Sequence, residues 1–86
     1  MDATIEWSDE RTGRERKLSC HRPSGYEARI LVAGNELSAR LWKPHESRDS
    51  FVVSPRSYDD SEIERTVERV KAEIAQRLEK LESGHS

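Results

Sequence analysis

Apolar side chains recur at every second position in three neighbouring stretches of the chain, residues 16–22, 26–33 and 36–43. This period of two is typical of β-strands that bury one face and expose the other. Turn residues separate the stretches. Pro23-Ser24-Gly25 suits a three-residue hairpin loop, and Gly34-Asn35 suits a two-residue loop. The pattern therefore predicts three consecutive antiparallel strands.

The loop lengths set the register of these strands, because a slip of one residue would turn every side chain to the other face. In this register, apolar residues meet apolar residues on one face of the sheet. The predicted pairs on that face are Cys20 with Ala28, Val32 with Leu37, Ile30 with Ala39 and Ala28 with Leu41. On the opposite face they are Ser19 with Arg29, His21 with Glu27, Arg29 with Arg40 and Glu27 with Trp42.

Weaker patterns predict one further strand on each side of this unit. Ile5 and Trp7 alternate with polar residues over residues 3–8, and a polar turn is expected over residues 9–14. A short fifth strand or an extended edge is expected over residues 51–54. Pro55 should end it, because proline lacks the amide donor of a regular strand.

A helical period replaces the period of two near the end of the chain. Two overlapping capping boxes, Asp59–Glu62 and Ser61–Glu64, indicate where the helix begins. We expect a helix over about residues 60–82, with a frayed tail over residues 83–86. Its apolar stripe has the spacing of a straight α-helix and consists of Ile63, Val67, Val70, Ile74, Leu78 and Leu81.

These elements predict an α+β fold of two layers, with an antiparallel meander of four to five strands packed on one long C-terminal helix. At 86 residues, the chain is expected to be a single domain, residues 1–86. The expected core combines the helix stripe with Ile5, Trp7, Leu18, Cys20, Tyr26, Ile30, Val32, Leu37, Leu41 and Phe51.

Composition narrows the class of protein. The residues are 33% hydrophobic and 37% charged, and the longest unbroken apolar run is residues 30–33. No segment approaches the roughly 18 apolar residues of a membrane span, and no signal peptide is recognisable. We therefore expect a soluble cytoplasmic protein without a membrane partner.

Charge is distributed unevenly along the chain. Residues 11–43 carry eight basic and three acidic side chains, whereas residues 59–86 carry five basic and eight acidic ones. The sequence thus predicts a basic sheet backed by an acidic helix.

The candidate binding surface is the sheet face that the helix leaves open, with Lys17, Arg29, Leu31, Arg40 and Trp42 as its residues. Arginines directly opposite one another destabilise a sheet, so Arg29 and Arg40 need an offset. An arginine side chain stacked on Trp42, together with a nearby carboxylate of Glu27 or Glu36, would offset this repulsion. A bound anion would also offset it.

The open face has three interpretations: a solvated charged surface with no partner, or a binding surface for one of two kinds of partner. Its apolar and basic residues suit a protein partner or a second copy of the chain. Basic residues beside an aromatic ring also suit single-stranded nucleic acid. If the helix overhangs the sheet, Leu78 and Leu81 stay partly uncovered and become candidates for a helix-mediated dimer contact.

Catalytic signals are missing from the sequence. His21, His45 and His85 are scattered, no Gly-rich phosphate loop is present, and Cys20 is expected to face the core. We therefore assign no catalytic, cofactor-binding or metal-binding residue. The sequence favours a small non-enzymatic interaction or regulatory protein that forms a homodimer and recognises a protein partner or itself through the open face. Single-stranded nucleic-acid binding by the same face is the alternative.

Overall fold

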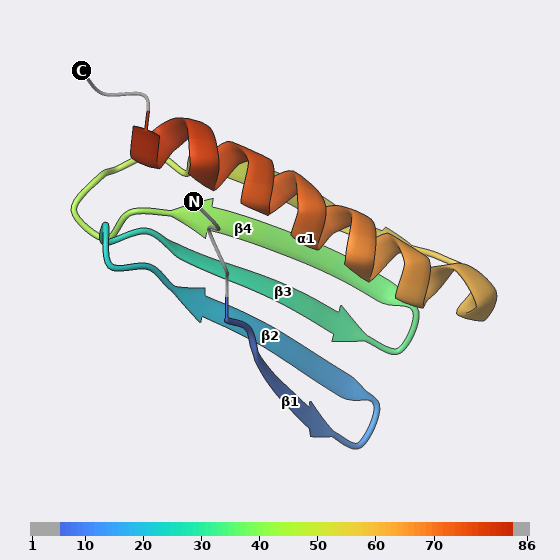
Figure 1. Ribbon diagram of the computed structural model, residues 1–86. Helices are drawn as coiled ribbons and strands as arrows, with labels where there is room; N and C mark the ends of the chain where they lie inside the picture. Colours follow the sequence, from blue (N-terminus) through green and yellow to red (C-terminus); the bar gives the residue numbers. More distant parts are fainter. Residues whose placement is uncertain (1–5, 84–86) are drawn as a thin grey trace.

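A computed structural model describes residues 6–83, which form one antiparallel sheet with one helix across a single face (Figure 1). Sheet order follows chain order: β1 (Ser8–Thr12), β2 (Glu15–His21), β3 (Glu27–Ala33), β4 (Glu36–Trp42) and β5 (Phe51–Ser57). The helix, α1 (Asp60–Ser83), follows directly. The predicted α+β meander with one C-terminal helix is therefore confirmed. Residues 84–86 of the expected tail lie outside the described residues.

The two central hairpins have the predicted register at every pair named above. Gly34 closes the β3–β4 loop with a φ of 63°, and Gly25 closes the β2–β3 loop with a φ of 101°. These are left-handed conformations that glycine adopts without steric cost. Turn chemistry and hydrophobic pattern thus specify the same pairing, which makes the register predictable.

The first strand lies later in the chain than predicted. Its expected range, residues 3–8, falls partly on residues 1–5, outside the described residues. Trp7 precedes β1 and packs partly buried against the core. The strand itself is β1, in which every residue is exposed, so no apolar alternation marks it. The predicted polar turn shrinks to Gly13 and Arg14.

Strand β5 continues past Pro55, which was expected to end it. Its pairing with β4 shifts between Leu37 and Ala39, an irregularity in the region of Ser54 and Pro55. Because β5 is the edge of the described sheet, only one of its sides needs regular hydrogen bonds, and proline is tolerated there. The predicted end at Pro55 is therefore wrong, because the pairing irregularity of this edge strand accommodates the proline.

The core lies between the sheet and α1. The helix contributes Val67, Val70, Ile74 and Leu78, and the sheet side contributes Leu18, Cys20, Tyr26, Ala28, Ile30, Val32, Leu37, Ala39 and Leu41. Trp7, Phe51, Ile63 and Leu81 pack against this core while partly exposed. The predicted core is thus largely confirmed, with Ile5 outside the described residues.

Leu78 is only 1% exposed, so the expectation that the helix end leaves it uncovered is wrong. Leu81 is also packed partly buried against the core. The β2–β3 loop extends the covered area at this end of the sheet, since Tyr26 is buried and Arg22 bonds Glu82 in the last turn of α1. Leu78 has no free surface for a dimer contact, and Leu81 has little.

Candidate functional site on the open sheet face

All five candidate surface residues lie on the sheet face opposite α1. The registers place Lys17 opposite Leu31 and Arg29 opposite Arg40, with Trp42 two residues further along β4. Their chain neighbours Leu18, Ile30 and Leu41 are fully buried, so the alternating side chains point away from the helix. The structure therefore brings the predicted set together on one surface, called the open face below.

The indole ring of Trp42 lies close to the guanidinium groups of both arginines. The Arg40 guanidinium carbon lies 4.5 Å from the centroid of the indole ring, and that of Arg29 lies 5.7 Å from it. Such contacts attract a cation to the ring face. The predicted stacking is confirmed, and it offsets part of the repulsion between two like charges placed directly opposite one another.

The carboxylate beside Arg40 comes from an unexpected segment. Arg40 Nε donates a hydrogen bond of 2.9 Å to Asp49 Oδ1, in the loop between β4 and β5. Glu27, one of the two predicted neighbours, instead contacts His21 at 2.9 Å. No periodicity marks a loop residue that folds back onto a strand, so the sequence offered no signal for Asp49.

Apolar surface borders the arginine–tryptophan cluster. Leu31 is 43% exposed and Val52 is 54% exposed, the only large exposed hydrophobic residues in the described range 6–83. A shallow depression of about 270 Å³ joins them and is lined by Arg29, Leu31, Ser38, Ala39, Arg40, Trp42, Val52, Val53 and Pro55. The end of the open face that holds Arg29, Arg40 and Trp42 is therefore also lined by apolar side chains.

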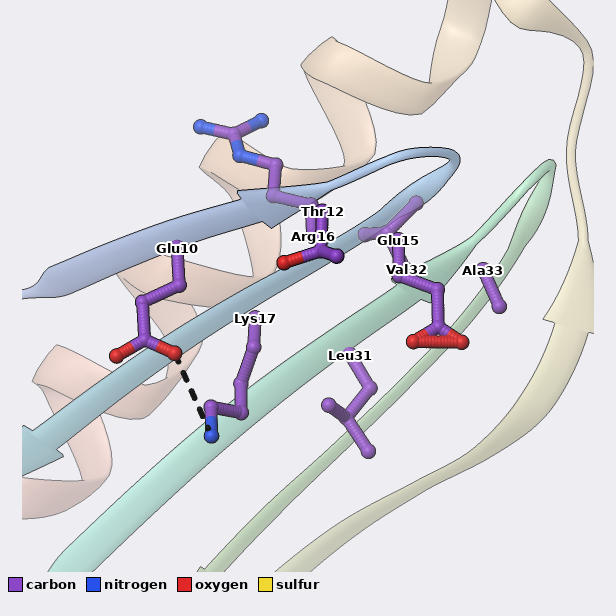
Figure 2. A pocket seen from close by; sticks show the side chains of 8 residues that line it. All are labelled: Glu10, Thr12, Glu15, Arg16, Lys17, Leu31, Val32 and Ala33. Atoms are coloured by element: carbon purple, nitrogen blue, oxygen red, sulfur yellow. Dashed lines mark ion pairs between the residues drawn. The ribbon is translucent and has the colours of Figure 1, made fainter.

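The other end of the open face holds side chains of both signs, among them Glu10, Glu15 and Lys17 (Figure 2). A second depression of about 270 Å³ is lined by Glu10, Thr12, Glu15, Arg16, Lys17, Leu31, Val32 and Ala33. Lys17 Nζ lies 3.6 Å from Glu10 Oε2, whereas Glu15 has no ion-pair partner within residues 6–83. Leu31 borders both depressions and lies between the two ends.

Part of the basic charge assigned to the sheet by sequence is neutralised. Arg16 contacts Asp9 at 2.9 Å and Glu64 at 3.2 Å, on the helix side of the sheet. Its hydrogen bond holds the pKa of Asp9 below the ordinary range. Arg22 pairs with Glu82 at 2.9 Å. Two pairs between the layers, Arg16–Glu64 and Arg22–Glu82, thus offset part of the predicted contrast between a basic sheet and an acidic helix.

Few side chains in the described range have the exposure or grouping of catalytic or metal-binding residues. Cys20 is 3% exposed, and burial raises the pKa of its thiol, which disfavours the reactive thiolate. Within residues 6–83, no three His, Cys, Asp or Glu side chains gather as metal ligands. His45 lies in the exposed β4–β5 loop, and His85 is outside the described range. No helix within the described range is long and apolar enough to cross a membrane.

The sequence matches no protein-family model, and neither a curated protein nor a solved structure is similar to it. The functional argument therefore depends on the geometry of the open face alone.

Proposed function

We propose that this protein is a small non-enzymatic interaction module, and that its open sheet face binds a second copy of the chain. The proposal depends chiefly on Arg40. Its side chain is held by Trp42 and Asp49 yet remains 54% exposed. An arginine fixed before binding loses less conformational freedom in a complex, and Trp–Arg clusters are typical of interface hot spots.

Charge complementarity within the face supports a second copy as its occupant. Arg29 and Arg40, the latter paired with Asp49, lie on one side of Leu31 along the strands, whereas Glu15 and Glu36 lie on the other. Glu15 and Glu36 are exposed and have no ion-pair partner in the described part of the chain. In a two-fold dimer with Leu31 near the axis, the end of each copy that holds the two arginines meets the end of the other that holds these two glutamates.

The size of the face sets the expected strength of this dimer. The central strands have seven residues each, so the sheet face measures about 23 Å by about 20 Å at ordinary strand spacings. A face of this outline is at the small end for a specific protein interface. We therefore expect a weak, reversible dimer with a Kd in the micromolar range or above.

Nucleic acid is less favoured as the partner of this face. Phosphate binding draws its free energy from unpaired cations that release counterions. Lys17 is paired with Glu10, and Arg40 with Asp49. Among the five candidate residues of the open face, Arg29 is therefore the one basic residue that has no ion pair within residues 6–83.

Sedimentation of the full chain at increasing concentration tests the proposal. The wild type should shift from monomer towards dimer, and Leu31→Asp should remain monomeric because it places a charge near the two-fold axis. Ala72→Asp, which adds the same charge on the exposed side of α1, should sediment like the wild type. Equal behaviour of Leu31→Asp and the wild type would refute the proposal. Salt-sensitive oligonucleotide binding that is lost in Trp42→Ala would favour the nucleic-acid alternative.

A further inference from the structure

A second surface feature lies on the helix side of the sheet, where the end of β5 meets the first turns of α1. This hollow, of about 450 Å³, is lined by Arg56, Ser57, Tyr58, Glu62, Arg65, Thr66 and Arg69. Five of these seven residues are exposed, so the hollow is open to solvent. It gathers three guanidinium groups, one from β5 and two from α1, and none of them lines the depressions of the open face.

The three arginines are among the cations of the described range that form no ion pair, and they are gathered in one hollow. Arg16, Arg22 and Lys71 each form an ion pair with a helix carboxylate. Within residues 6–83, Arg56, Arg65 and Arg69 form none, although Arg56 lies 6.0 Å from the Tyr58 ring. Glu62 is the sole carboxylate that lines the hollow, so the hollow carries a net positive charge of two.

Neighbouring charges on α1 act on these arginines in both directions, since Glu62 lies three residues before Arg65 and Glu73 lies four residues after Arg69. Arg65 and Arg69 are four residues apart on α1, a spacing at which like charges repel. The carboxylates that form ion pairs with the sheet, Glu64 and Glu82, face β2 and the β2–β3 loop. Arginine forks are well suited to bind tetrahedral oxyanions through paired N–H donors.

We propose that the hollow binds the phosphate group of a small phosphomonoester. Ser57 adds a hydroxyl donor to its lining, whereas the Thr66 hydroxyl is already used, donating to the Glu62 carbonyl oxygen at 2.9 Å. A phosphomonoester carries close to two negative charges at neutral pH, which matches the net charge of the hollow.

The distribution of basic residues along α1 favours one discrete phosphate over a nucleic-acid backbone. The next basic residues on this side, Arg77 and Lys80, line a separate depression together with Glu73. Arg77 is eight residues beyond Arg69, about 12 Å along the helix, and it stacks on Phe51 at 4.7 Å. A backbone lying along the helix would meet a gap and a carboxylate instead of a continuous row of cations.

NMR titration of the arginine Nε–H signals with inorganic phosphate and with phenyl phosphate tests this site. At constant ionic strength, both should give saturable shifts at Arg56, Arg65 and Arg69. The double variant Arg65→Gln, Arg69→Gln should lose at least about tenfold in affinity, the scale of charge-assisted hydrogen bonds. Glutamine keeps the helix propensity of these exposed positions, so the fold should be retained.

A charge-matched variant, Arg77→Gln with Lys80→Gln, separates site binding from general charge attraction. It removes the same charge from the same helix and should leave the phosphate affinity within about twofold of wild type. Equal losses in the two double variants, or linear shifts spread over all arginines, would overturn the proposal. Binding of a single-stranded oligonucleotide without terminal phosphates, in the absence of phosphomonoester binding, would overturn it in favour of a backbone-binding surface.

Discussion

Arg22 and Glu82 are joined by two hydrogen bonds of 2.9 Å, one from Arg22 Nε to Glu82 Oε2 and one from Nη2 to Oε1. Ser24 Oγ donates a further hydrogen bond of 2.6 Å to the same carboxylate. These contacts fasten the last turn of α1 to the β2–β3 loop, and they explain why the helix end stays close to the sheet. The bond from Arg22 lowers the pKa of Glu82 below its ordinary value.

Glu82→Gln is expected to destabilise the protein by about 1 kcal/mol near neutral pH, since a partly exposed charge-assisted pair is lost. For a domain of this size, the melting temperature should fall by roughly 4–8 °C. Glu79→Gln removes a carboxylate with no ion pair within residues 6–83 and should melt like the wild type.

The Arg22–Glu82 pair should make the stability of the protein depend on pH. Because the pKa of Glu82 is lower in the folded than in the unfolded chain, its stabilisation is present above the unfolded pKa, near 4.5. It is lost as the pH falls through the lower folded pKa. Thermal melts of wild type and Glu82→Gln should therefore differ at pH 7 and converge in strongly acidic solution. A difference of constant size at all pH values would contradict this account.

Leu78 and Leu81 are expected to respond differently to truncation. Leu78→Ala removes a fully buried side chain and should cost about 2–5 kcal/mol, whereas Leu81→Ala, at a partly exposed position, should cost clearly less. Denaturant unfolding of both variants measures the difference. If Leu78→Ala were as stable as the wild type and lost its self-association, the helix-mediated dimer would be supported instead.

The Cys20 thiol is expected to be unreactive in the folded protein. It is 3% exposed, and burial raises its pKa, so little thiolate is accessible at neutral pH. A colorimetric thiol reagent should label it slowly in buffer and quickly in denaturant. Fast labelling in buffer would show that this part of the core opens readily.

The central strands were predictable because two local signals agree in each hairpin. Gly34-Asn35 specifies a two-residue loop, and the pairs it implies, such as Val32 with Leu37, are apolar on both strands. Strand β1 has no such agreement: Gly13 provides a turn signal, with a φ of 59°, but apolar alternation is missing. Its residues are all exposed, so hydrogen bonding to β2, rather than burial, determines where it forms.

The site was partly predictable for the same reason. Alternation placed Arg29, Arg40 and Trp42 on one face, and the register made the two arginines neighbours. The ion pairs depend on contacts between distant segments, such as Arg22 with Glu82, which are 60 residues apart. No local pattern encodes such contacts, so the partial neutralisation of the basic sheet was not foreseen.

The most direct test of the central claim is a mixing experiment with two charge-reversed variants. One carries Arg29→Glu and Arg40→Glu, so both ends of its open face are acidic. The other carries Glu15→Arg and Glu36→Arg, so both ends are basic. Circular dichroism melts should first establish that each variant is folded.

Sedimentation at concentrations around the wild-type Kd should show each variant alone as a monomer, because like-charged ends meet in its own dimer. An equimolar mixture should form a heterodimer at least as stable as the wild-type dimer, since each acidic end then meets a basic one. A mixture that stays monomeric, while the wild type dimerises, would contradict the proposal that the two ends of the open face bind one another.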